Sequence, residues 1–250
     1  PEGQTHDFPS LRHQTNLLSI VIMSQRPPLW TIIVPAVIPF IATIAYFVVL
    51  TDNWWAKLAY GATKIVMVAW PALIAWRWSR TPTPSVSRRG RGLAMGAIAG
   101  LVFAAGIVLL AIGPLADLFA SARPAIAVKI AGFGLSSIGS YVAAAVFLSF
   151  AHSALEEYYW RYFIFGELRT RLPGAWPHLI SGLAFALHHC VVAAVFVGLW
   201  PGILLGAVVG AAGMCWSGLY ERHGTLWAPW IAHACADIAL MALGASVLSA

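Results

Sequence analysis

Seven long apolar runs constrain this chain more than any other feature. An α-helix rises about 1.5 Å per residue, so roughly 20 apolar residues are needed to cross a hydrocarbon core of about 30 Å. Backbone groups inside that core must be hydrogen-bonded within the segment, which favours helices. We therefore expect an all-α, polytopic transmembrane bundle of about seven (7–8) helices, in a single membrane domain over residues 1–250. The expected spans are residues 29–50, 57–78, 92–113, 135–165, 176–199, 203–220 and 226–248.

Composition agrees with a membrane location. Hydrophobic residues make up 60% of the chain and charged residues only 10%, whereas soluble domains carry about 25% charged residues. The net charge is +6, but the basic residues lie between apolar runs and do not form one solvated face. The expected partner is therefore the lipid bilayer, and nucleic acid is not expected as a partner.

Arginine clusters predict the orientation. The arginine-rich segment 77–91, the segment 167–171 and Arg222 all fall on one side of the membrane if the chain starts inside, and the positive-inside rule assigns that side to the cytoplasm. The N-terminus is then cytoplasmic. Frequent Ala, Gly, Pro and Arg are typical of a bacterial source of high GC content, so the expected location is the bacterial inner membrane.

Some segments depart from a simple pattern of spans and loops. Residues 1–28 are expected to be a tail with an amphipathic segment at 10–25, and residues 29–134 to form the N-terminal helices. Residues 114–129 contain charged residues and a proline and are expected to be a loop with a short interfacial piece. The turn between the fifth and sixth spans is expected at Trp200-Pro201-Gly202. All three cysteines lie in apolar runs, where packing is expected and disulfides are not: Cys190, Cys215 and Cys235.

The fourth span carries the most unusual residues of the chain. At about 1.5 Å per residue, residues 135–165 would run some 45 Å, so this helix is expected to be tilted or to break near Gly139. It contains Glu156, Glu157 and Arg161, although each charge at mid-membrane costs roughly 2.5–3.5 kcal/mol. Glu157 and Arg161 are four residues apart and can pair on one helical face. Glu156, about 100° further round the helix, then points elsewhere.

Two other spans carry polar side chains at similar depth, and both contain histidine. His188 and His189 are adjacent in the fifth span, so only one is expected to face the glutamate, and spacing does not select it. In the seventh span Asp237 follows His233 by one turn and can orient its imidazole or accept a proton from it. Counted from the cytoplasmic helix ends, these residues lie roughly 10–20 Å deep. A single polar cavity between the fourth, fifth and seventh helices, opening to the cytoplasm, is expected to hold them.

The other polar residues within the apolar runs have simpler explanations. His152 and Ser153 lie one turn before Glu156 and are expected to pack or to support the site. Lys64, inside the second span, is expected to extend its ammonium toward the nearby membrane surface.

Such a set of residues is suited to hydrolysis by an activated water. A carboxylate in a cavity of low dielectric, with histidines beside it, can act as a base toward water near neutral pH. A second histidine with a polar partner can donate a hydrogen bond to a developing oxyanion. The sum of these roles is hydrolysis of an acyl bond, such as a peptide, without a covalent nucleophile.

Three motifs resemble those of the CAAX protease and bacteriocin-processing (CPBP, or Abi) family of intramembrane glutamic proteases. Glu156-Glu157-x-x-x-Arg161 is similar to the first motif, and Phe185-x-x-x-His189 to the second, which selects His189 over His188. His233-x-x-x-Asp237 is similar to the third, His-x-x-x-Asn/Asp. The resemblance runs from about residue 151 to 237, within an expected catalytic core at 135–250.

The resemblance implies a role for each residue. Glu156 and His189 would activate the water, and His233 with Asp237 would stabilise the oxyanion. Glu157 and Arg161 would support the site. The eukaryotic prenyl-protein member tends to have Asn at the last position; with Asp237 there, the carboxyl group would orient His233 or be protonated. The implied substrate is a membrane-associated protein or peptide, processed at its C-terminus or its leader, and no cofactor is implied.

Three alternatives remain open at the level of sequence. A zinc metalloprotease would use Glu156, His189 and His233 as ligands with one open position. A bacteriocin-immunity or scaffold protein would keep the polar cluster for structure alone. A proton-coupled transporter would also bury Glu and His, but it would be expected to show an inverted repeat, and the sequence shows no such symmetry.

Overall fold

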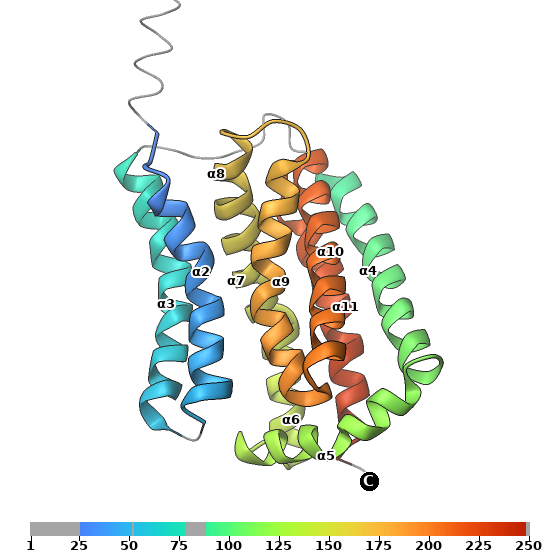
Figure 1. Cartoon of the computed structure of the whole chain (residues 1–250). Helices are drawn as coiled ribbons and strands as arrows, with labels where there is room; N and C mark the ends of the chain where they lie inside the picture. Colours follow the sequence, from blue (N-terminus) through green and yellow to red (C-terminus); the bar gives the residue numbers. More distant parts are fainter. Residues whose placement is uncertain (1–25, 52, 79–88, 249–250) are drawn as a thin grey trace, which may run out of the picture.

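All regular elements in the computed structural model are helices in the residues that it describes, which are 26–51, 53–78 and 89–248 (Figure 1). Seven of these helices are long and apolar enough to cross a membrane. The predicted all-α, polytopic membrane fold is therefore confirmed. The seven are α2 (Trp30–Ile44) continued by η1 (Ala45–Val49), α3 (Trp54–Arg77), α4 (Arg89–Ile112), the continuous helix from α6 to α8, α9 (Trp176–Val197), α10 (Leu199–His223) and α11 (Trp227–Ala245).

The expected loop at 114–129 is wrong, because most of it forms helix α5 (Ala116–Gly132). This helix lies across one end of the bundle (Figure 1). Asp117 lies in its first turn and Lys129 in its last, which complements the helix dipole. The same charges resemble loop residues when only composition is considered. Arg123 donates a hydrogen bond to Ser246 Oγ at 3.2 Å, which connects α5 to the end of α11.

The turn between the fifth and sixth spans also differs from the expectation. The chain reverses at Gly198, which has φ +88°, and not at Trp200-Pro201-Gly202. Pro201 lies in the first turn of α10, where the N–H that proline lacks would have no helical acceptor. The segment expected at 10–25 lies outside the described residues.

The overlong fourth span is a single helix of 32 residues that does not break near Gly139. It begins at Ile138, where the Ser137 side chain accepts a hydrogen bond from the Ser140 amide at 3.1 Å. Two π-helical segments flank the short α-helical stretch that contains Glu156 and Glu157. Such wider turns often occur at functional sites. Its parts are α6 (Ile138–Val146), η2 (Phe147–His152), α7 (Ser153–Glu157), η3 (Tyr158–Phe165) and α8 (Gly166–Arg169).

Small residues bring two pairs of helices into close contact. Helix α10 packs against α9, and α11 against α4. A Cβ atom added at Gly206 would overlap Cys190, and one added at Gly96 would overlap the backbone of Ala228. Close approach of this kind lets membrane helices associate through van der Waals contact. All three cysteines are free thiols, as the sequence predicts.

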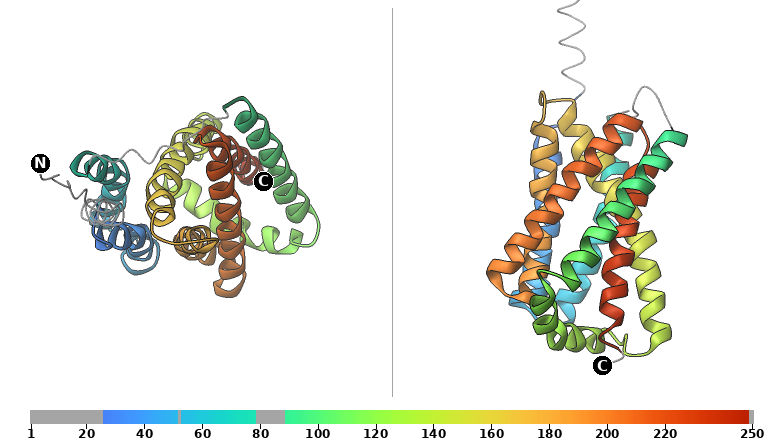
Figure 2. Two further views of the ribbon diagram at one scale, coloured as in Figure 1. Left: turned by 90° about the horizontal axis from the view of Figure 1, so that it is seen from above. Right: turned by 90° about the vertical axis from the view of Figure 1, so that its right-hand side faces the viewer.

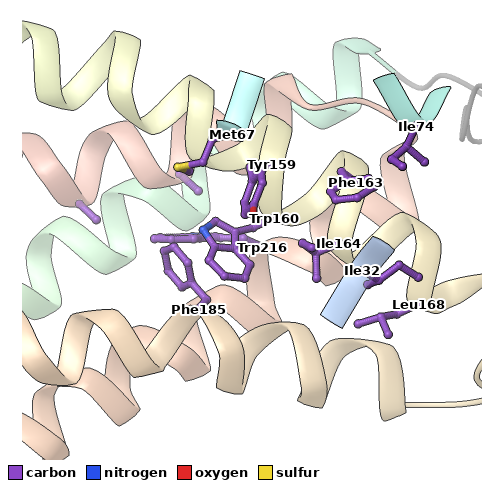
Figure 3. Close-up of a cluster of buried hydrophobic side chains, with 12 residues drawn as sticks. Ile32, Met67, Ile74, Tyr159, Trp160, Phe163, Ile164, Leu168, Phe185 and Trp216 are labelled. Atoms are coloured by element: carbon purple, nitrogen blue, oxygen red, sulfur yellow. The ribbon is translucent and has the colours of Figure 1, made fainter. Parts of the chain in front are cut away.

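The helices that carry the polar residues lie in the middle of the bundle. Helices α2 and α3 lie together at one edge and α4 at the opposite edge, with α6–α8 between them (Figures 1 and 2). A cluster of buried aromatic and aliphatic side chains joins α2 and α3 to η3, α9 and α10 (Figure 3). Within it Tyr159 donates a hydrogen bond to the Pro35 carbonyl at 2.5 Å. The core thus holds η3, and with it the preceding α7, against α2 and α3 on one side and against α9 and α10 on the other.

Ionic contacts connect helix ends on the side of the bundle where α8 ends. Glu221 of α10 pairs with Arg169 of α8 and, at 3.0 Å, with His178 of α9. Arg171 pairs with Glu167 at 2.5 Å and donates to the Pro27 carbonyl at 2.6 Å, just before α2. This is the side that the arginine distribution assigns to the cytoplasm.

Candidate active site

Glu156 of α7 lies at the centre of the polar residues contributed by three helices. Its side chain is buried. Oε1 lies 3.7 Å from Nε2 of His188 on α9, and Oε2 lies 3.7 Å from Nε2 of His233 on α11. Side chains that are far apart in the sequence therefore surround one carboxyl group. They come from α7, α9 and α11, which belong to the three spans that the sequence predicts to carry the site.

Glu157 is engaged by two partners, one of which is His233. Its Oε1 accepts a hydrogen bond from Nδ1 of His233 at 2.8 Å and forms an ion pair with Nη1 of Arg161 at 3.1 Å. The side chains of Glu157 and Arg161 are only 1% exposed, so this pair is shielded from solvent. Because Nδ1 of His233 is occupied, its Nε2 is the atom that faces Glu156 and Asp237.

Arg161 is held by aromatic rings as well as by charge. Its Cζ lies 4.5 Å from the ring centroid of Phe185 and 5.0 Å from that of Trp216, a geometry that stabilises a guanidinium through cation–π attraction. A Cβ atom at Gly213 would lie 3.0 Å from Nη2 of Arg161, so glycine leaves space for the cation. Trp216 also stacks on His233, with centroids 4.2 Å apart. The Trp216 ring thus contacts both Arg161 of the ion pair and His233.

Both adjacent histidines lie beside Glu156, although spacing predicts that only one faces it. Ligand atoms of Glu156, His188 and His189 all lie within 4.8 Å of one another. The His188 ring lies parallel to Trp160, with centroids 5.7 Å apart, and its buried Nδ1 has no hydrogen-bond partner within the described ranges. Nδ1 of His189 bonds the Phe185 carbonyl at 2.9 Å, which leaves its Nε2 available. His188 is thus a site residue that the motif does not identify.

Two further polar groups border the site, and both are partly exposed. Nε2 of His152, one turn before Glu156, lies 3.5 Å from Glu156 Oε1, and its side chain is 21% exposed. Asp237 Oδ1 lies 3.7 Å from His233 Nε2 and is also 21% exposed. His152, which the sequence assigns to packing or support, directly faces the carboxyl group. The opening of the site to the cytoplasm stays a prediction.

The fold and site together define a class of protein. The chain is an integral membrane protein whose apolar helices enclose a carboxylate surrounded by imidazoles. Residues 137–239 match the family model described as Type II CAAX prenyl endopeptidase Rce1-like, and that range contains all three motifs. The resemblance to the CAAX protease family is therefore confirmed over this segment. The match supports an endopeptidase activity in the membrane. No curated protein and no solved structure matches the chain.

Proposed function

We propose that this chain is a glutamic-type intramembrane endopeptidase, which hydrolyses a peptide bond of a membrane-associated protein with a water activated by Glu156. The observation that carries the proposal is the different environment of the two neighbouring glutamates. Glu157 is occupied by Arg161 and by Nδ1 of His233. Glu156 faces the imidazoles of His152, His188 and His233 at 3.5–3.7 Å. One carboxylate is thereby available to act as a base.

In the proposed reaction Glu156 removes a proton from water as the oxygen attacks the peptide carbonyl carbon. The carbonyl double bond opens and its oxygen becomes the oxyanion of a tetrahedral intermediate. When the C–N bond breaks, the proton held by Glu156 passes to the leaving nitrogen, so that an acid and an amine are released. His188 and His189 position the water and the carboxylate, because their ligand atoms lie within 4.8 Å of the Glu156 oxygen.

His233 supplies the oxyanion-stabilising donor in this proposal. Its Nδ1–H donates to Glu157, and Arg161 neutralises that carboxylate. When the ring carries a second proton, its Nε2–H can donate to the oxyanion, and Asp237 at 3.7 Å compensates the positive charge. Asp237 therefore acts through His233, and Glu157 with Arg161 supports the ring from its other side.

The proposed substrate is a protein or peptide anchored in the bilayer and processed at its C-terminus or leader. C-terminal processing is favoured because the matched family is described as a CAAX prenyl endopeptidase. For a bacterial protein, an anchor other than a prenyl group is the expected form, because bacteria largely lack protein prenylation.

Direct attack by water is expected to leave no covalent intermediate. We expect the chain, reconstituted in lipid vesicles, to cleave a farnesylated peptide ending in Cys-aliphatic-aliphatic-X or an unprenylated peptide with an apolar membrane anchor. In ¹⁸O-labelled water the new carboxylate should carry ¹⁸O, and acid quenching during turnover should trap no peptide fragment on the protein. Mass spectrometry checks both results. A trapped acyl-protein would contradict the mechanism, and absence of any cleavage would favour the scaffold alternative.

A zinc protease is the second candidate, because Glu156, His188 and His189 have the donor types and proximity of a metal site. This set differs from the zinc ligands proposed from the sequence, since His188 replaces His233. In the metal-free mechanism, incubation with EDTA and phenanthroline should leave kcat/KM unchanged within about two-fold, whereas removal of a catalytic zinc would abolish activity. Metal analysis of the purified protein is the second readout. Loss of activity that is restored by zinc would favour the metalloprotease.

A further inference from the structure

A groove at one end of the bundle lies apart from the candidate active site. It has a volume of about 310 Å³ and lies between α5 and the last turn of α9, and ligand sites commonly have volumes of about 300–1,000 Å³. Glu156 is 18 residues beyond Ile138, where the helix that carries it begins at this end of the bundle (Figure 1), which is roughly 25 Å along the helix. Five apolar residues and one lysine line the groove: Pro124, Ala125, Val128, Lys129, Val195 and Phe196.

Lys129 brings to this apolar groove a charge that no acidic side chain balances. Its ammonium lies 5.7 Å from the ring centroid of Phe47 on η1, a contact that supports the cation without neutralising it. Asp117, at the other end of α5, is 12 residues or about 18 Å away. Within the described ranges no carboxylate pairs with Lys129. An anion can therefore bind the ammonium without displacing an ion pair.

The groove lies at the level of the lipid headgroups. Helix α5 lies across the end of the bundle and does not belong to the seven spanning helices (Figures 1 and 2). Exposed tryptophans begin the spans at the same end, namely Trp54 and Trp55 of α3 and Trp200 of α10. Tryptophan rings gather where the hydrocarbon core meets the headgroups. Lys129 is therefore placed where phosphate groups are present.

The helix beneath Lys129 departs from regular geometry. Phe47 and Tyr46 belong to the π-helical segment η1 (Ala45–Val49), and such segments often occur at functional sites. The other two π-helical segments of the described chain flank the Glu156 region, whereas η1 contacts α9 close to the groove. Tyr46 stacks on Tyr60 of α3, with ring centroids 5.0 Å apart, and this contact fixes η1 against its neighbour. The geometry of η1 is thus a second feature that distinguishes this place.

A ligand that suits the groove has an anionic group attached to an apolar chain. Phosphate oxygens accept charge-assisted hydrogen bonds from an ammonium, and the apolar walls can bury hydrocarbon. A peptide would bring amide groups that these walls cannot hydrogen-bond. We propose that the groove binds an anionic phospholipid, with its phosphate on Lys129 and an acyl chain between α5 and α9. This inference does not depend on the proposed peptidase function.

The test compares two lipids with identical acyl chains, anionic phosphatidylglycerol and zwitterionic phosphatidylcholine. Each is added to the full chain in a neutral detergent, and native mass spectrometry measures the fraction of protein that retains one lipid. Wild-type protein should bind phosphatidylglycerol about fivefold more tightly, the factor expected for one lysine near anionic lipid. Added phosphatidylglycerol should also raise the unfolding temperature, because a ligand that binds the folded state stabilises it.

Two variants separate the charge from the groove. Lys129→Gln should weaken binding of phosphatidylglycerol about fivefold, to the level of phosphatidylcholine, and leave phosphatidylcholine unchanged. Ala125→Trp places a large side chain in the groove and should weaken binding of both lipids. The matched control is Lys57→Gln, which removes an exposed lysine at the same end of the bundle, in the first turn of α3, and should change neither.

The outcomes of this test are independent of peptide cleavage. Glu156→Gln, which removes the proposed base, should bind phosphatidylglycerol as the wild type does. Equal affinity of the wild-type protein for the two lipids would overturn the proposal, and so would a preference for phosphatidylglycerol that survives in Lys129→Gln. Equal stabilisation by glycerophosphoglycerol, the headgroup without acyl chains, would indicate a site for soluble phosphate esters and overturn the lipid assignment. A dimer that Ala125→Trp abolishes would assign the groove to a second copy of the chain and overturn it as well.

Discussion

Glu156→Gln is expected to reduce kcat/KM for peptide cleavage by about 10²–10⁴-fold, the usual contribution of a general base. The amide keeps the size of the side chain and can occupy the same space beside His188 and His233, whose Nε2 atoms lie 3.7 Å from the carboxylate oxygens. It cannot take a proton from water at neutral pH. The expected loss is therefore in the chemical step, and initial rates in vesicles at saturating and limiting substrate measure it.

The control for this prediction is Glu221→Gln, which makes the same chemical change at a partly exposed position at the end of α10. Glu221 pairs with Arg169 and His178, away from the site, so activity should change little. Both variants should insert into vesicles and unfold at temperatures close to that of wild type. His189→Ala and His233→Ala are expected to lose activity in the same assay. Retained turnover in Glu156→Gln would show that Glu156 is not the general base.

The membrane spans could be predicted from the sequence because apolar length is a local property. The second span begins at Trp54 where 57 was expected, and the fifth ends at Val197 where 199 was expected. Helix α5 was missed because its three charged residues and Pro124 resemble loop composition, although Asp117 and Lys129 lie in its first and last turns, where they stabilise a helix. The position of the turn at Gly198 was missed because a proline in the first turn of a helix and a proline in a loop look alike in sequence.

The pairs in the site that could be anticipated are those made within one helix. Glu157 and Arg161 are four residues apart and form an ion pair, as helix geometry allows. The position of His188 beside Glu156 depends on Trp160 of another helix, against which its ring lies. Lys64 was expected to extend toward the nearby surface, and its ammonium lies over the ring of Tyr60, one turn nearer the end of α3 at Trp54. Contacts between helices depend on packing, which local spacing does not encode.

Arg161→Met is expected to destabilise the protein by about 3–5 kcal/mol, the usual effect of removing one partner of a buried ion pair. Methionine can fill the space between Phe185 and Trp216, so the loss arises mainly from the charge that remains on Glu157 and not from a cavity. Cleavage activity should fall as well, because Glu157 holds Nδ1 of His233. Unfolding in detergent micelles, followed by tryptophan fluorescence, measures the stability.

A matched variant and a double variant separate charge from packing in this prediction. Arg169→Met removes an ion pair whose arginine side chain is 44% exposed, so its cost should stay below about 1 kcal/mol. Adding Glu157→Gln to Arg161→Met removes the uncompensated charge and should recover about 0.5–3 kcal/mol of the lost stability, a coupling typical of residues in contact. Activity should not recover with it, because a neutral amide no longer stabilises the protonated His233 ring.

If Arg161→Met is as stable as wild type, the buried ion pair does not stabilise this site. If the double variant regains both stability and activity, Glu157 has no role beyond balancing the arginine.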